Sequence, residues 1–185
     1  AMVADQFNCD ALTSVDELLK RYPDVQAVSV AVPTKYHREA SQPLLERQIA
    51  CLIEKPLAPT VEEARDLAKL ASDYNAVLQV GHTERFNPAV RAVEAMNVPA
   101  RFIEVDRVSP MTFRSMDVGV VMDMMIHDLD IVLMLARSPI KRVEAVGVCV
   151  MGDHEDVASA RIVFESGCVA NLTASRLALK TERKM

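Results

Sequence analysis

The chain has 185 residues, half of them hydrophobic and a quarter charged, and this composition excludes a disordered, collagen-like or coiled-coil protein. The formal net charge of -5 argues against nucleic acid or an anionic membrane surface as a partner. The apolar stretches are short and interrupted by charged residues, so the sequence predicts no run of about 20 apolar residues that could span a membrane.

Helices and strands are expected to alternate over the first part of the chain. Two S/T-x-x-E patterns, Ser14 to Glu17 and Thr60 to Glu63, are typical of helix N-termini. The expected elements in chain order are a helix over 14–21, a buried strand over 24–32, a helix over 36–48, a strand over 50–53, a helix over 60–75 and a strand over 76–81. This alternation predicts βαβ crossovers on one parallel sheet, whose ligands bind at the carboxyl ends of the strands.

The pattern changes at about residue 85, which we take as the start of a second unit over 85–185. The expected elements are a helix over 88–96, a strand over 100–109, a helix over 120–136, and strands over 142–150, 157–163 and 168–175. Neighbouring strands without intervening helices indicate an open antiparallel sheet. The fold class is therefore α/β, an incomplete doubly wound, Rossmann-like sheet followed by an α+β domain.

Lys55 lies where the strand over 50–53 ends, within the tripeptide Glu54-Lys55-Pro56. Its ammonium could hydrogen-bond a substrate hydroxyl, and partial burial would lower its pKa toward acid–base chemistry. A solvated ion pair at the end of the strand explains the tripeptide equally well.

Asp123 and His127 are four residues apart, which places them on one face of an α-helix, with Asp130 farther along the same side. A carboxylate can orient an imidazole and raise its basicity, so the pair could act as a general base. A buried structural ion pair and, less favoured, a metal site are the alternatives. We predict no metal, because no further cysteine or histidine lies at ligand spacing.

Four motifs in this order resemble the Gfo/Idh/MocA family of nicotinamide-dependent sugar oxidoreductases. They are Ala31-Val32-Pro33-Thr34 followed by His37, then Glu54-Lys55-Pro56, then Val80 to Pro88 (VGHTERFNP), then Asp123-x-x-x-His127-x-x-Asp130. Gly81 to Pro88 (GHTERFNP) and the runs Arg114 to Asp117 and Asn171 to Arg176 look most like the bacterial branch that oxidises UDP-N-acetylglucosamine at C3 for lipid A synthesis.

This resemblance implies a role for each of these residues. Lys55, Asp123 and His127 would form the catalytic group, and Pro33, Thr34, His37, Glu54, Lys55 and Pro56 would line NAD, with NADP not excluded. Arg85, Asn87 and Arg114 would hold the substrate. Residues 1–84 would be the C-terminal part of a dinucleotide-binding domain, and residues 85–185 a truncated domain for substrate binding and oligomerisation.

The sequence departs from the family in its glycines. Members of the family open with a G-x-G-x-x-G loop that holds the pyrophosphate, followed by an acidic residue for the ribose. The five glycines here include no pair at that spacing. We therefore expect the chain to be a fragment that lacks about the first two βα units, and to bind NAD weakly or not at all.

A rival hypothesis is a non-catalytic interaction module that dimerises through the second sheet. Strands over 157–163 and 168–175 without a covering helix would leave an apolar face exposed. A dehydrogenase of another sugar or of inositol is a further alternative.

The predicted partners are a sugar-nucleotide substrate and further copies of the chain. Four widely spaced cysteines and no signal peptide indicate reduced thiols in the cytoplasm.

Overall fold

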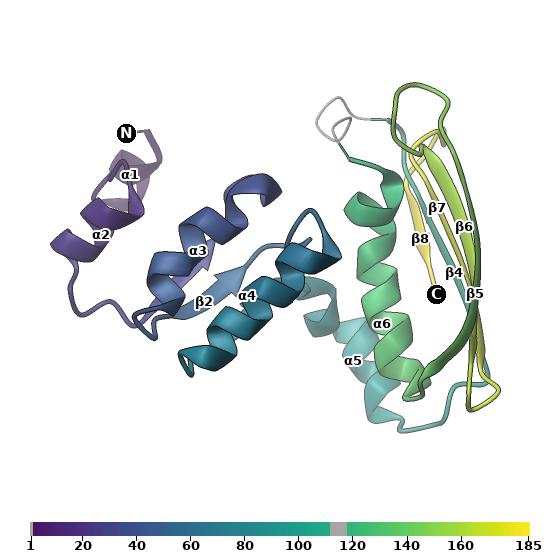
Figure 1. The fold of residues 1–185 in the computed structure, drawn as a ribbon. Helices are drawn as coiled ribbons and strands as arrows, with labels where there is room; N and C mark the ends of the chain where they lie inside the picture. Colours follow the sequence, from purple (N-terminus) through teal and green to yellow (C-terminus); the bar gives the residue numbers. More distant parts are fainter. Residues whose placement is uncertain (1, 112–117) are drawn as a thin grey trace. The chain divides into compact units, whose positions relative to one another are not determined.

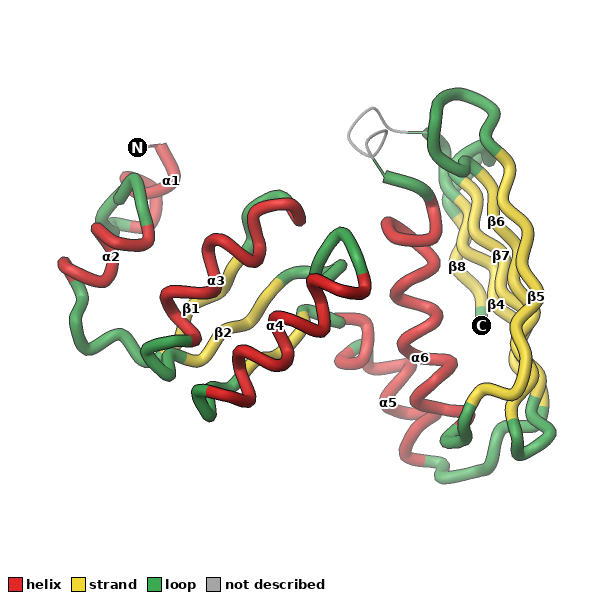
Figure 2. The backbone as a smooth tube through the Cα atoms, viewed as in Figure 1, coloured by secondary structure: helices red, strands yellow, loops and turns green. Residues whose placement is uncertain are grey.

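The computed structural model describes residues 2–111 and 118–185. The chain divides into two compact units, Ala1–Gly81 and His82–Met185, and each is described by itself. Figures 1 and 2 show the helices and strands of both. Within the described residues, no helix has both the length and the apolar character needed to cross a lipid bilayer.

The first unit is a three-stranded parallel sheet with helices. Its elements are α1 (Met2–Phe7), α2 (Val15–Arg21), β1 (Ala27–Val30), η1 (Thr34–Tyr36), α3 (His37–Leu45), β2 (Ala50–Ile53), α4 (Val61–Asp73) and β3 (Leu78–Val80). The strand order is β1-β2-β3, and both pairings are parallel. The predicted alternation and parallel pairing are confirmed, whereas α1 was not predicted because its sequence carries no capping signal.

Both predicted helix starts are confirmed by their hydrogen bonds. The Glu17 amide donates to Ser14 Oγ at 3.1 Å at the start of α2, and the Glu63 amide donates to Thr60 Oγ1 at 3.2 Å at the start of α4. Each side chain satisfies an amide that has no partner within the helix, which typically stabilises a helix by about 1 kcal/mol.

The core of the first unit lies on one face of its sheet. Val30, Cys51 and Ile53 are buried there with Leu44, Leu45 and Leu67 of α3 and α4. Leu52 points to the other face and is 41% exposed. The expectation of a buried valine-rich strand is wrong for most of β1, because Val30 is buried there while Ala27 and Ser29 are exposed.

The second unit is built on a five-stranded sheet. Its elements are η2 (Thr83–Phe86), α5 (Pro88–Ala95), β4 (Phe102–Val108), η4 (Val121–Met125), α6 (Ile126–Ala136), β5 (Ile140–Val148), β6 (Val157–Phe164), β7 (Val169–Ser175) and β8 (Glu182–Lys184). The strand order is β5-β6-β7-β4-β8. α6 runs along one face of this sheet (Figure 1), and the core lies between them.

The second sheet is mixed rather than purely antiparallel. β5, β6 and β7 pair antiparallel as predicted, but β4 pairs with β7 in parallel, and the short β8 was not predicted. β6 and β7 also bury alternate residues, including Ile162 and Leu172, in the core that they share with α6. The expectation that no helix covers these strands is therefore wrong for this face.

The long predicted helix over 120–136 is not a regular α-helix. Its first part, η4, is a π-helix, and only Ile126–Ala136 is α-helical. A π-helix has i to i+5 hydrogen bonds and is wider than an α-helix. Asp123 lies in the π-helix, so the α-helical spacing on which its pairing with His127 was predicted does not hold over this stretch.

Candidate functional site

The three strands of the first unit end at the same level. In the register of the sheet, Val30 is level with Ile53, and Ile53 is level with Val80. The ladder continues one step beyond β2 and β3: the Glu54 amide donates to Val30 O at 3.0 Å and the Gly81 amide donates to Ile53 O at 2.7 Å. The segments after β1, β2 and β3 therefore lie side by side at the carboxyl edge, as predicted from the βαβ pattern.

The segment after β1 is held by His37. The ring of His37 is buried, and its Nδ1 and Nε2 lie 3.1 Å from Leu57 O and 2.9 Å from Val32 O. The imidazole thus ties the segment after β1 to the segment after β2. His37 is predicted to line a cofactor, and the hydrogen bonds described for its ring are with these two backbone carbonyls. Thr34, at the start of η1, is half-buried.

Glu54, Lys55 and Pro56 follow β2 at this edge. Glu54 is exposed and Lys55 is half-buried, and the Lys55-Pro56 peptide bond is cis. A Cβ on Gly81 would lie 3.2 Å from Glu54 Oε2, so the segments after β2 and β3 approach closely. An ammonium at the carboxyl edge of a parallel sheet can donate to a hydroxyl of a ligand bound there.

Asp123 and His127 lie in η4 and in the first turn of α6, and both are half-buried. Most of their neighbours along the chain are apolar, and Met125, Ile131 and Val132 are buried. π-helical turns occur often at functional sites. The segment thus brings a carboxylate and an imidazole, one helical turn apart, onto an otherwise apolar element.

Two further carboxylates of α6 pair with arginines. Arg107 Nε and Nη2 of β4 donate to Asp128 at 2.7 Å each, and both side chains are buried. Burial lowers the pKa of the Arg107 guanidinium, but the bonds to Asp128 outweigh this and raise it overall. Arg85 donates to Asp130 through Nε and Nη2 at 2.6 Å each. α6 is therefore fixed by two bidentate pairs, at Asp128 and Asp130, which both follow its candidate base His127 in the sequence.

The residues predicted to hold a substrate have different environments. Arg85 is paired with Asp130, but half of its side chain remains exposed. Asn87 caps α5, since its Oδ1 accepts from the Ala89 amide at 3.0 Å. Arg114 lies outside the described residues.

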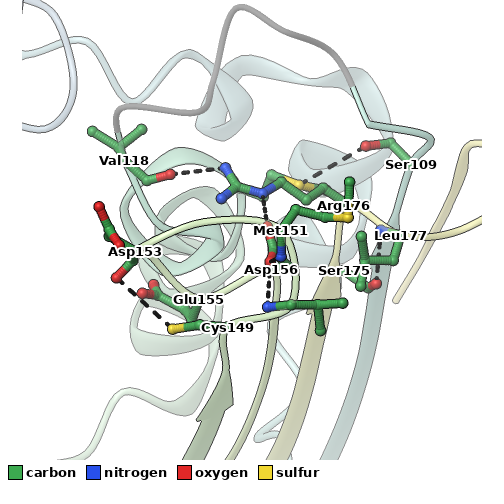
Figure 3. A network of polar contacts seen from close by, with 12 residues as sticks. Ser109, Val118, Cys149, Met151, Asp153, Glu155, Asp156, Ser175, Arg176 and Leu177 are labelled. Atoms are coloured by element: carbon green, nitrogen blue, oxygen red, sulfur yellow. Dashed lines mark hydrogen bonds and ion pairs between the residues drawn. The ribbon is translucent and has the colours of Figure 1, made fainter.

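Sequence reasoning missed a buried charge cluster at the ends of β6 and β7 (Figure 3). Asp156 is fully buried and accepts from the Val150 and Met151 amides at 2.7 Å each and from Arg176 Nε at 2.6 Å. The two amides and then the guanidinium lower the pKa of Asp156 to about 2. Arg176 Nη1 also donates to Val118 O at 2.9 Å. Arg176 lies 20 residues from Asp156 and 58 residues from Val118 in the sequence, so no motif indicates these pairs.

Across 2–111 and 118–185, no three His, Cys, Asp or Glu side chains are grouped so that they could hold a metal ion.

Family profiles match both units. Residues 1–82 match a profile described as an oxidoreductase family with an NAD-binding Rossmann fold, and residues 90–185 match the GFO/IDH/MocA C-terminal domain. Relatives include UDP-N-acetylglucosamine 3-dehydrogenase of Acidithiobacillus ferrooxidans, 39% identical over the whole chain, and inositol 2-dehydrogenase of Rhizobium meliloti, 27% identical over 95% of it.

Solved structures agree with these matches. A crystal form of the Acidithiobacillus enzyme superposes on 98% of the chain with a TM-score of 0.91. The NAD complex of GenD2, from gentamicin A biosynthesis, is 22% identical, covers 97% of the chain and has a TM-score of 0.86, which shows a shared fold. The chain spans 58% of the length of the Acidithiobacillus relative and 57% of the length of the Rhizobium relative. It spans 57% of the crystallised Acidithiobacillus chain and 56% of the GenD2 chain.

Proposed function

Because the chain belongs to the Gfo/Idh/MocA family of oxidoreductases, we propose that its protein oxidises the C3 hydroxyl of a UDP-N-acetylhexosamine with NAD. The observation that carries this proposal is the 39% identity, over the whole chain, to a UDP-N-acetylglucosamine 3-dehydrogenase. The identity to an inositol 2-dehydrogenase is lower, at 27%. Inositol is therefore the second substrate to test.

The carboxyl edge of the first sheet fits the nicotinamide end of NAD. Thr34, Glu54 and Lys55 offer donors and acceptors in the segments that follow β1 and β2, and Gly81 leaves space where a Cβ would approach Glu54. We assign Pro33, Thr34, Glu54 and Pro56 to the wall of this site, with His37 fixing the segments that carry them. NADP is the alternative cofactor.

The proposed reaction breaks two bonds of the substrate. The C3–H bond breaks with loss of a hydride, the O–H bond breaks with loss of a proton, and a ketone forms at C3. NAD, when bound, accepts the hydride. His127 takes the proton as a general base, Lys55 hydrogen-bonds the reacting oxygen, and Asp123 orients His127. Arg85, Asn87 and Arg114 are assigned to the rest of the sugar nucleotide.

Substitution of the two proton-handling residues in the full-length protein tests this assignment. Lys55→Met and His127→Ala should each lower kcat for UDP-N-acetylglucosamine by about 10²- to 10⁴-fold, the usual contribution of acid–base catalysis. Asp123→Asn should have a smaller effect, because the imidazole remains. Turnover is measured as NADH formation, with myo-inositol as the competing substrate.

Matched controls are available in exposed positions. Lys69 is an exposed lysine of α4 and His154 is an exposed histidine, so Lys69→Met and His154→Ala should leave kcat unchanged. If Lys55→Met and His127→Ala fold and also retain full turnover, the catalytic assignment is wrong. If the parent oxidises inositol but no sugar nucleotide, the substrate assignment is wrong.

We also propose that the protein self-associates through the face of the second sheet that points away from α6. That face carries the apolar side chains of Phe102, Val146, Val148, Val157, Val163 and Val169. Val146 is 62% exposed and Val148 is 49% exposed. Sedimentation should show at least a dimer, which Val146→Asp weakens by placing a charge in the interface. A parent that stays monomeric at high concentration would contradict this.

We place the reaction in the cytoplasm, in the synthesis of lipid A or a surface polysaccharide. The four cysteines are free thiols, two of them buried, which is typical of a reducing compartment. Burial raises the pKa of the Cys51 thiol to about 11, so this thiol is protonated at neutral pH.

A further inference from the structure

The backbone that leads into η4 is attached to the ends of two strands of the second sheet. The Val120 amide donates to the Glu155 carbonyl at 3.0 Å, and the Val121 amide donates to Glu155 Oε1 at 3.1 Å. Arg176 holds the same stretch through Val118 O at 2.9 Å. Residues 118, 120 and 121 are thus each fixed by Glu155 or Arg176, just before and at the first residue of the helix that carries Asp123.

Arg176, and Asp156 next to Glu155 in the sequence, are themselves held by several hydrogen bonds. The Arg176 amide donates to the Asp156 carbonyl at 3.0 Å, and Arg176 Nε binds the buried Asp156 carboxylate (Figure 3). Asp156 is 0% exposed and Arg176 is 4% exposed. The Arg176 side chain loses little further conformational entropy when it binds Val118, because Asp156 already holds it in place. The cluster can therefore position the backbone at Val118 to Val121 accurately.

Two glycines make room for the Glu155 side chain. A Cβ on Gly119 would overlap the Glu155 carboxylate, and a Cβ on Gly147 would lie 3.2 Å from Glu155 Cβ. The carboxylate can reach the Val121 amide only because position 119 has no side chain. The Asp123 amide in turn donates to the Gly119 carbonyl at 3.0 Å, so the fixed backbone continues directly to the candidate catalytic carboxylate.

We propose that Glu155 is a positioning residue for Asp123. Through the Val121 amide it fixes the start of η4, and hence where the Asp123 carboxylate stands relative to His127. This inference rests on the proposed function for its effect on turnover, but the contact itself can be tested without activity. Arg176, which is bound to Asp156, supports the same backbone through the Val118 carbonyl.

Glu155→Ala and Glu155→Gln in the full-length protein separate positioning from stability. Glu155→Ala should lower kcat by about 10- to 100-fold, because small misplacements of catalytic groups have effects of this size, while KM for NAD changes by less than about twofold. Glu155→Gln keeps an oxygen that can accept from the Val121 amide, so it should restore most of kcat. Glu165→Ala, at an exposed turn position, is the charge-matched control. Equal kcat in Glu155→Ala and the parent would overturn the proposal.

Gly119→Ala provides an independent second test. The new methyl group should displace the Glu155 carboxylate, so Gly119→Ala should resemble Glu155→Ala, and the double variant should be no worse than either. Additive losses of kcat would contradict the proposal.

Amide hydrogen exchange gives a readout that needs no turnover. The Val121 amide should exchange at least about tenfold faster in Glu155→Ala and in Gly119→Ala, and at nearly the parent rate in Glu155→Gln. Unchanged protection of Val121 in Glu155→Ala would overturn the proposal. The parent could oxidise no sugar nucleotide while the Val121 amide exchanges faster in Glu155→Ala. The proposed function would then be wrong, and the attachment of Val121 by Glu155 would be supported.

Discussion

In the first unit, Lys55 follows the strand β2, whose position relative to β1 and β3 is set by backbone hydrogen bonds. In the second unit, His127 lies on a helix that is held by a buried ion pair between charged side chains. Arg107 with Asp128, and Arg176 with Asp156, are all less than 8% exposed. The ion pairs seen in the first unit, such as Lys69 with Asp73, are exposed. A parallel sheet thus positions functional groups through its backbone register, while a helix on a sheet face needs side-chain anchors to fix its rotation.

The largest expected effect comes from breaking a buried pair. Asp128→Ala should lower the free energy of unfolding of the second unit by about 3–5 kcal/mol, because it leaves the Arg107 guanidinium buried without its carboxylate. Asp73→Ala removes an exposed partner in α4 and should cost less than about 1 kcal/mol. Urea unfolding followed by circular dichroism measures both. Equal losses of unfolding free energy in Asp128→Ala and Asp73→Ala would contradict the difference between the two units.

Acid should weaken the second unit through Asp156. The folded state lowers the pKa of this carboxyl to about 2, so the stabilisation is fully present above its ordinary pKa of about 3.9 and is lost as the pH falls from there toward 2. Asp156→Asn should start less stable and depend less on pH over that range. Urea midpoints measured at several pH values below about 5 test this, and parallel pH curves for the two proteins would contradict it.

The smallest expected effect concerns the first unit. Thr60→Ala removes the oxygen that caps α4 and should cost about 1 kcal/mol, whereas Thr60→Ser keeps the cap and should cost less. Hydrogen exchange assigns the loss to a unit: amides of α4 should lose protection and those of α6 should not. Loss of protection in α6 would show that the two units do not unfold independently.

The sequence predicted the features that depend on local patterns. The caps at Ser14 and Thr60, the parallel order of the first sheet and the level of Glu54-Lys55-Pro56 follow from short-range periodicity and from the rule that parallel strands share a carboxyl edge. The roles assigned to Lys55, Asp123 and His127 remain predictions.

What the sequence did not predict depends on contacts between distant residues. The parallel pairing of β4 with β7 joins residues more than 60 positions apart, and Arg107 meets Asp128 only once that sheet and α6 have formed. Asp156 and Arg176 lie 20 residues apart on different strands. Such pairs leave no periodic signal, because their spacing is set by the tertiary fold. The π-helix was missed because an apolar run fits either helix type.

The π-helix at Val121–Met125 also affects how related sequences can be aligned with this one. A π turn holds about one residue more than an α turn, and each residue of an α-helix rotates the chain by about 100°. A relative with a regular α-helix here would need a one-residue gap within 121–125 to keep both ends of the helix in register. An alignment without that gap would match Asp123 or His127 to the wrong face of the helix. Insertions and deletions in this short stretch therefore carry information about chemistry that substitution patterns alone would hide.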